Sequence, residues 1–184
     1  SLSSPLERIL ADASTGFFGL IYVAFPLMLA PLVTVQENGT ALLLFLLVVV
    51  WAGDITALYV GRLLGRHPIA PTLSPKKTWE GAAGSILGSI LAGLALVACG
   101  SLLYRHNIEL LFYAQPWWYW TGLAILLNIA AQIGDLLESA IKRGAGVKDS
   151  GTLLPGHGGV LDRIDALLLA LPVLWYALLF RQAY

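Results

Sequence analysis

Long apolar blocks separated by short polar stretches form the dominant pattern along this chain. Several blocks exceed the ~18 mostly apolar residues that mark a membrane-spanning helix. We therefore predict an all-α fold, a polytopic transmembrane helix bundle with about five spanning helices, in a single integral membrane domain over residues 1–184. The predicted spans are residues 14–35, 40–64, 81–104, 117–142 and 160–180.

The polar stretches predict the connections between these spans. Residues 1–13 are mixed in polarity and predict a short interfacial helix, with Ser4 as its cap and Pro5 at its first position. The three prolines within residues 65–80 predict a loop, and the Gly-rich residues 143–159 predict a second loop. We expect the N-terminus to be mature or truncated, because the chain begins without Met and lacks the order of a signal peptide.

The composition supports the lipid bilayer as solvent and excludes some functions. Hydrophobic residues make up 58% of the chain and charged residues 12%, too few charges to cover a water-soluble globule of this size. The formal net charge is zero, so we expect no nucleic acid partner. The single cysteine, Cys99, excludes an intramolecular disulfide.

The basic residues are distributed unevenly between the two sides of the predicted bundle. With the N-terminus inside, the outer side holds only Arg105 and Arg181. The excess inside predicts a cytoplasmic location for both loops and for a site between them, in what we expect to be a bacterial inner membrane. The nine inner basic residues are Arg8, Arg62, Arg66, Lys76, Lys77, Lys142, Arg143, Lys148 and Arg163.

One face of the predicted fourth span carries polar residues at helical spacing. From Asn128 to Lys142 the polar residues follow each other at intervals of four, three, four and three residues, which confines their side chains to an arc of roughly 80° on the helix. A polar stripe on an otherwise apolar span lines a cavity or faces a partner. Pairing of Asp135 with a nearby Lys or Arg, which would only tie helices together, stays open as an alternative. Glu138 borders the stripe, whose members are Asn128, Gln132, Asp135, Ser139 and Lys142.

A Gly-rich loop leads directly into the fifth span. Glycines at a helix N-terminus let backbone N–H groups approach an anion, so Gly158 and Gly159 predict a phosphate site. Carboxylates beside a phosphate indicate a divalent cation, and we predict Mg²⁺ at Asp135 and Asp162, with a second cation left open. His157 either caps the turn or takes a catalytic or phosphate-contacting role. The predicted cations for the phosphates are Lys142, Arg143, Lys148 and Arg163.

The loop at residues 65–80 carries a second basic group. Its lysines alone would also fit a loop that only sets the membrane topology. The neighbouring hydroxyl and flat aromatic side chain favour the binding of a nucleotide base and its phosphates. Asp54, in the later half of the second span, either faces the same pocket or pairs with Arg62. The predicted nucleotide ligands are Lys76, Lys77, Thr78 and Trp79.

Two sequence motifs carry a family resemblance. The first, Ser139-x-Ile-Lys142-Arg143-x4-Lys148-Asp149-x-Gly151-x2-Leu154-Pro155-x-His157-Gly158-Gly159-Val160-x-Asp162-Arg163-Ile164-Asp165, resembles the signature of the phosphatidate cytidylyltransferases. The second, Ser74-Pro75-Lys76-Lys77-Thr78-Trp79-Glu80-Gly81, is also similar to that family, as is the Gly53-Asp54 region. The similarity covers roughly residues 50–170. Members of the family usually have further transmembrane helices before the region that begins here.

The resemblance implies a reaction and a set of residue roles. CTP and phosphatidic acid would give CDP-diacylglycerol and pyrophosphate with Mg²⁺, by direct in-line attack of the lipid phosphate. Catalysis would then rest on positioning and charge neutralisation, with Asp149 and Asp165 orienting the cations. The implied catalytic residues are Asp135, Asp162, Lys142, Arg143 and His157. The implied substrate-binding residues are Asp54, Lys76, Lys77, Thr78, Trp79, Ser139, Lys148, Gly158, Gly159 and Arg163.

Two alternative functions fit the same pattern. A related CTP-dependent membrane transferase or kinase would act on another lipid, and an ion-coupled transporter would use Asp54, Asp135 and Asp162 as a cation pathway. The acids lie at the inner ends of their spans beside a basic loop, which favours the enzyme. The small residues from Gly81 to Gly93 predict close helix packing, within the chain or in a homodimer.

Overall fold

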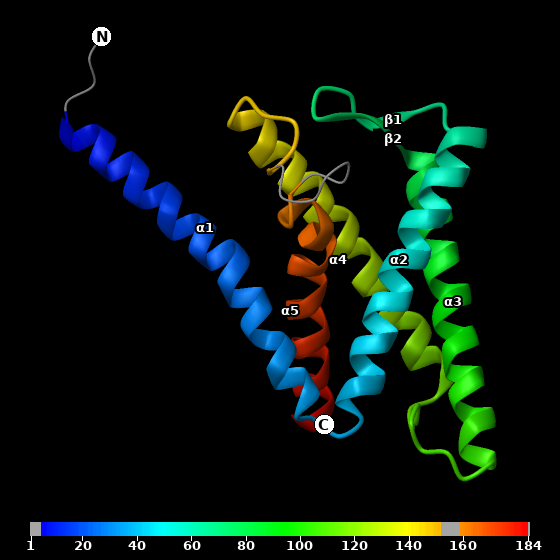
Figure 1. Ribbon diagram of the computed structural model, residues 1–184. Helices are drawn as coiled ribbons and strands as arrows, with labels where there is room; N and C mark the ends of the chain where they lie inside the picture. Colours follow the sequence, from blue (N-terminus) through cyan, green and yellow to red (C-terminus); the bar gives the residue numbers. More distant parts are fainter. Residues whose placement is uncertain (1–4, 152–158, 184) are drawn as a thin grey trace.

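The computed structural model describes residues 5–151 and 159–183. Five helices and one small antiparallel sheet account for its regular structure (Figure 1). Each helix is long and apolar enough to cross a membrane, which confirms the predicted helical membrane fold. The elements are α1 (Pro5–Thr34), α2 (Gly39–Leu64), β1 (Pro68–Ala70), β2 (Ser74–Thr78), α3 (Trp79–Arg105), α4 (Trp117–Gly144) and α5 (Leu161–Ala183).

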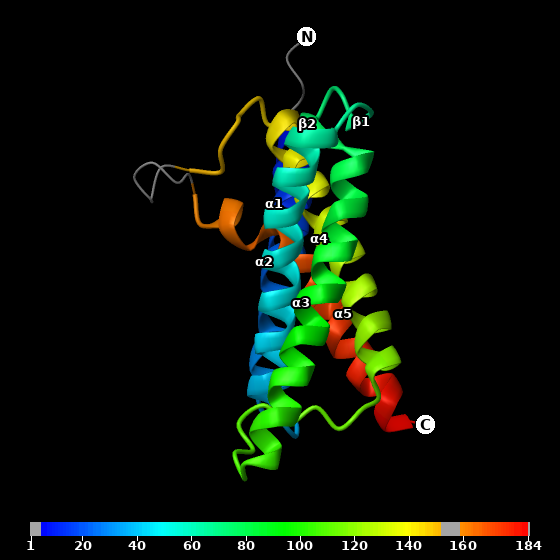
Figure 2. The ribbon, with the colours of Figure 1, turned by 90° about the vertical axis from the view of Figure 1, so that its right-hand side faces the viewer.

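The helices are arranged in two closely packed pairs, α2 with α3 and α4 with α5, and α3 also packs against α4. The helix α1 contacts α5 and α2, and its N-terminal half leans away from the other helices (Figure 1). The β1–β2 hairpin and the end of α4 lie at one end of the bundle, here called the hairpin end (Figures 1 and 2). The described start of the second predicted loop, which follows α4, therefore lies at the same end as the hairpin.

Glycines bring α2 and α3 into close contact. A Cβ added at Gly84 would lie 2.6 Å from Val60 Cγ2, and one added at Gly88 would collide with Thr56. Small residues at such interfaces let helix backbones approach closely in lipid, where the hydrophobic effect does not drive association. The prediction that this span is a packing helix is confirmed, because its buried residues are all glycine or serine.

Aromatic side chains fill the core at the end opposite the hairpin. The ring centroid of Trp120 lies 5.0 Å from that of Phe45 and 4.9 Å from that of Tyr113. The Tyr113 hydroxyl donates a hydrogen bond to the Ala41 carbonyl at 3.0 Å, and burial raises the pKa of this phenol to about 12. These contacts fix the connection before α4 against α2.

A buried polar network joins α2, α3 and α4 in the middle of the bundle. Asn128 Nδ2 donates to Ser85 Oγ at 2.8 Å and to Ser89 Oγ at 2.7 Å, and Ser89 Oγ donates to the Val49 carbonyl at 2.7 Å. Gln132 Nε2 donates to Asn128 Oδ1 at 2.6 Å. Such networks satisfy polar groups that would otherwise be costly in lipid, so they hold the three helices in register.

The first helix differs from the sequence prediction. A separate interfacial helix over residues 1–13 was expected, whereas α1 runs without a break from Pro5 to Thr34. The hydroxyls of Ser14 and Thr15 both donate to the Ala11 carbonyl, at 2.9 and 2.8 Å. These side chains bond back to their own helix and do not end it.

The loop at residues 65–80 differs too, because it forms a hairpin. Pro68 pairs with Thr78 and Ala70 with Ser74, with an irregularity in register between them. Proline cannot donate to a ladder, but it is tolerated at the first residue of a strand and on edge strands. A two-stranded sheet consists only of edge strands, so its prolines do not prevent the pairing.

Candidate functional site

The hairpin is fastened to the start of α3 by two side chains. Thr78 Oγ1 caps the helix by accepting from the Gly81 N–H at 3.1 Å. Glu80 Oε2 accepts from the N–H groups of Arg66 and His67, at 3.1 and 3.3 Å, and Glu80 Oε1 lies 2.5 Å from His67 Nδ1. The hairpin therefore has a defined position above the helices, and so do the lysines that it carries.

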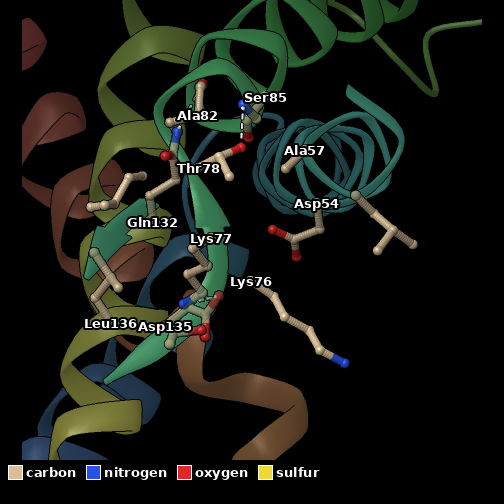
Figure 3. Close-up of a pocket in the computed structure, with 14 residues that line it drawn as sticks. Asp54, Ala57, Lys76, Lys77, Thr78, Ala82, Ser85, Gln132, Asp135 and Leu136 are labelled. Carbon is tan, nitrogen blue, oxygen red and sulfur yellow. Dashed lines mark hydrogen bonds and ion pairs between the residues drawn. The ribbon is translucent and has the colours of Figure 1, made fainter. Parts of the chain in front are cut away.

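A cavity of about 330 Å³ lies beneath the hairpin, between α2, α3 and α4. Its polar lining comes from Asp54 on α2, from Lys76, Lys77 and Thr78 on β2, and from Asp135 on α4, with Gln132 and Ser85 of the buried network nearby. Figure 3 shows Asp54 and Lys77 directed toward this space and Lys76 extending away from Asp135. Of the two alternatives for Asp54, the structure supports the pocket.

Lys77 and Asp135 form the central ion pair of the cavity, with Nζ 2.6 Å from Oδ2. The Nζ atom is buried and has no aligned hydrogen-bond partner, so the contact is an ion pair and not a directed hydrogen bond. Asp54 and Asp165 both interact electrostatically with Asp135 and with Lys77. The open alternative that Asp135 pairs with a nearby Lys holds in this structure.

A second ion-pair cluster joins α4 to α5. Lys142 Nζ lies 2.5 Å from Glu138 Oε2 and 2.6 Å from Asp162 Oδ1. The Glu138 residue is completely buried, and its side chain has no aligned hydrogen bond within the described part of the chain. Lys142 is therefore held by two carboxylates at once.

Asp162 also closes the base of the segment between α4 and α5. Its Oδ2 accepts from Ser150 N at 3.0 Å, Ser150 Oγ at 2.9 Å and Gly159 N at 2.7 Å. A Cβ at position 159 would lie 2.8 Å from Gly151 N and would collide with Ser150 Oγ. The Gly159 N–H was expected to face an anion, and here the anion is the carboxylate of Asp162.

The structure divides the predicted residues into two groups. Asp54, Lys76, Lys77, Thr78 and Asp135 share the cavity, whereas Ser139, Lys142, Arg143, Lys148, Gly159, Asp162 and Arg163 do not line it. Arg143 donates to the Val147 carbonyl at 3.1 Å, and Trp79, expected beside the base, is 63% exposed and does not line the cavity. His157 and Gly158 lie outside the described residues.

Two acids that the sequence prediction left outside the site are structurally important. Glu80 fixes the hairpin, and its only sequence signal is an acid in the first turn of a helix that follows a Pro-rich loop. Glu138 was noted only as a neighbour of the polar stripe, and it pairs one turn later with Lys142, which also contacts Asp162 of α5.

The acidic side chains are the candidate ligands for a metal ion. Among residues 5–151 and 159–183, no three His, Cys, Asp or Glu side chains are grouped closely enough to form a metal site by themselves. Mg²⁺ typically uses only one or two protein carboxylates and fills its other positions with water and substrate phosphates. Asp135, a carboxylate that lines the cavity, fits such a donor set, whereas Asp162 lies in the other group and pairs with Lys142, so the binding of one metal by both stays a prediction.

The fold and the site define a class: an integral membrane protein with a cationic and acidic cavity, at one end of its bundle, that suits phosphate groups. Comparison with known proteins gives the family. The cytidylyltransferase family matches residues 2–180, and the chain belongs to it.

Individual relatives carry a more specific name, phosphatidate cytidylyltransferase. The protein of that name from Brucella abortus biovar 1 (strain 9-941) is 44% identical over 158 residues, 85% of this chain and 54% of the relative. The one from Staphylococcus saprophyticus is 38% identical over 163 residues, 89% and 58% respectively. The one from Mycobacterium tuberculosis (strain H37Rv) is 36% identical over 169 residues, 92% and 48%. The chain spans about half the length of these curated relatives.

Proposed function

We propose that this chain transfers a cytidylyl group from CTP to phosphatidic acid, giving CDP-diacylglycerol and pyrophosphate. The observation that carries the proposal is the cavity under the hairpin, in which lysines and carboxylates from three separate segments share a space beside the bilayer. The family and the names of the relatives support the same reaction. The basic residues at the hairpin end support a cytoplasmic orientation of the cavity.

The proposed chemistry is a direct displacement. An oxygen of the lipid phosphate forms a bond to the α-phosphorus of CTP, while the bond from that phosphorus to the bridging oxygen of the β-phosphate breaks and pyrophosphate leaves. At neutral pH a phosphate monoester is largely ionised, with a second pKa of about 6, so no strong general base is needed. Positioning and charge neutralisation then supply the catalysis.

Each side chain has a proposed part in this displacement. Lys76, Lys77 and Thr78 bind the nucleotide from the hairpin, and Lys142, Arg143, Lys148 and Arg163 attract the phosphates. Mg²⁺ bound at Asp135 would neutralise phosphate charge at the cavity, and Asp162, which lies outside the cavity lining, is the second proposed ligand. Buried cations in a site of low dielectric stabilise developing negative charge better than water does.

The test uses two labels on CTP. Purified chain in lipid nanodiscs receives phosphatidic acid, Mg²⁺ and CTP labelled with ³²P at either the α or the γ position. Transfer of the α label to lipid is expected. Transfer of the γ label would instead indicate a kinase, and transfer of neither label would contradict the proposal.

Two substitutions test the carboxylates within the same assay. Asp135→Asn and Asp162→Asn should each lower turnover by at least about 100-fold, because each amide replaces a carboxylate that neutralises a cation. Glu37→Gln is the matched charge control, since it also replaces a carboxylate by an amide and Glu37 lines a separate cavity with Gln115 and Arg181. Full activity in either Asn variant would remove that residue from the proposed metal set.

A further inference from the structure

In this structure the cation that contacts the Asp135 carboxylate is the ammonium group of Lys77. Its buried Nζ lies 2.6 Å from Asp135 Oδ2 and within the electrostatic reach of Asp54 and Asp165. These three acids come from α2, α4 and α5, whereas the lysine comes from the hairpin. The ion pair thus joins Asp135 of α4 to a side chain carried on the hairpin.

A divalent cation at Asp135 would have to compete with this ammonium group. A cation bound directly to the Asp135 carboxylate and an ammonium 2.6 Å from its Oδ2 would lie within a few Å of each other, and like charges at that distance repel strongly. The lysine then needs another anion. The cavity that it lines, about 330 Å³ in volume, is where the nucleotide triphosphate would supply one.

Lys142 differs from Lys77 in a way that decides which lysine moves. Lys142 contacts both Glu138 and Asp162, so it keeps one carboxylate when the other binds a different cation. Among the ion pairs of the described residues, Lys77 has a single carboxylate partner, Asp135. Loss of that partner leaves the buried Nζ of Lys77 without an ion pair and with only its electrostatic interactions with Asp54 and Asp165, which is costly.

We propose that Lys77 is the resident counter-ion of Asp135 and moves to the phosphates of the nucleotide when a divalent cation takes its place. This inference rests on the proposed function, because it requires Asp135 to bind the cation. It assigns Lys77 two successive partners, first a carboxylate and then a phosphate. The lysine therefore opposes metal binding without nucleotide and favours nucleotide binding with metal.

Two affinities of one variant, for Mn²⁺ and for CTP, should change in opposite directions and so test this exchange. Free Mn²⁺ is followed by electron paramagnetic resonance on the full chain in nanodiscs, first without nucleotide. Lys77→Met should tighten Mn²⁺ binding by about fivefold or more, because the competing cation is gone. With saturating Mn²⁺ and no phosphatidic acid, the same variant should weaken CTP binding by about tenfold. Lys77→Gln serves as a second variant if the methionine variant folds poorly.

Matched controls separate the exchange from a general effect of charge. Lys76→Met removes the same charge from the same hairpin, but Lys76 extends away from Asp135, so its effect on Mn²⁺ affinity should be much smaller. Equal effects of the two methionine variants on Mn²⁺ affinity would overturn the proposal, as would unchanged Mn²⁺ binding or unchanged CTP binding in Lys77→Met. The Asp135→Asn variant distinguishes a failure of the metal assignment from a failure of the exchange alone. If it leaves Mn²⁺ affinity unaltered, the metal assignment fails and the exchange fails with it; if it weakens Mn²⁺ binding while Lys77→Met changes nothing, only the exchange fails.

Discussion

Replacing Gly53 with alanine should damage the polar network beneath the cavity. A Cβ at this position would collide with Asn128 Nδ2 and would lie 2.6 Å from Ser89 Oγ and 2.9 Å from Ser85 Oγ. Overpacking of this kind costs about 1–3 kcal/mol, and two interhelical hydrogen bonds in a membrane protein are worth about 0.6 kcal/mol each. Alanine's better helix propensity returns roughly 0.5–1 kcal/mol. The expected net loss is therefore about 1–4 kcal/mol.

The same substitution at Gly122 provides the control. Gly122 lies within α4, and an added Cβ there meets nothing within 4 Å, so Gly122→Ala should be neutral or slightly stabilising. Equilibrium unfolding in mixed micelles with increasing dodecyl sulfate measures both variants. If Gly53→Ala unfolds within ~0.5 kcal/mol of Gly122→Ala, the proposed clash is refuted. Adding Asn128→Ala should relieve part of the damage, because the nearest colliding atom is removed.

Three further predictions follow from the other contacts. Glu80→Ala should speed amide hydrogen exchange at Arg66 and His67 by about tenfold or more without changing helix content, because both N–H groups lose a charged acceptor; Glu109→Ala, at the other end, should leave both amides protected. Lys142→Met should destabilise the fold by about 3–5 kcal/mol by leaving Glu138 buried and unpaired, and Glu138→Leu in the same chain should restore most of that loss in the unfolding assay. The pKa of Tyr113 in the folded protein, about 12, lies above its ordinary value of 10.0. The contribution of this shift to the free energy of unfolding is therefore complete below pH 10 and is lost as the pH rises toward 12. Tyr113→Phe should make the decline of the free energy of unfolding over that interval shallower.

The helical bundle could be predicted from the sequence because membrane spans depend on local composition. Apolar blocks set the helices, and the glycines of α3 pointed correctly to its tight packing on α2. The polar stripe of α4 was also informative, since Asn128, Gln132 and Asp135 all face polar partners. In lipid the backbone must satisfy its own hydrogen bonds, which leaves few other structures for such blocks.

The parts that could not be predicted depend on tertiary contacts. Prolines in residues 65–80 suggested irregular structure, but a two-stranded hairpin has no central strand for proline to disrupt. Likewise, the sequence showed lysines and acids without showing which would meet. That Lys77 reaches Asp135 and that Lys142 lies between Glu138 and Asp162 follow from how α4 crosses β2 and α5. The sequence assigned the two aspartates to one metal, and that assignment stays a prediction.

The glycine-packed contact of α2 with α3 has a consequence for the membrane around the protein. With Val60 against Gly84 and Thr56 against Gly88, these helices have little room to slide past each other, so they tilt together and carry the hairpin with them. Asp135 belongs to the other helix pair. Helices tilt when the surrounding bilayer becomes thinner, and the hydrogen bonds from Asn128 on α4 to Ser85 and Ser89 on α3 couple the two pairs in that motion. We expect a change in bilayer thickness to alter the separation of Lys77 from Asp135 only as far as this network yields.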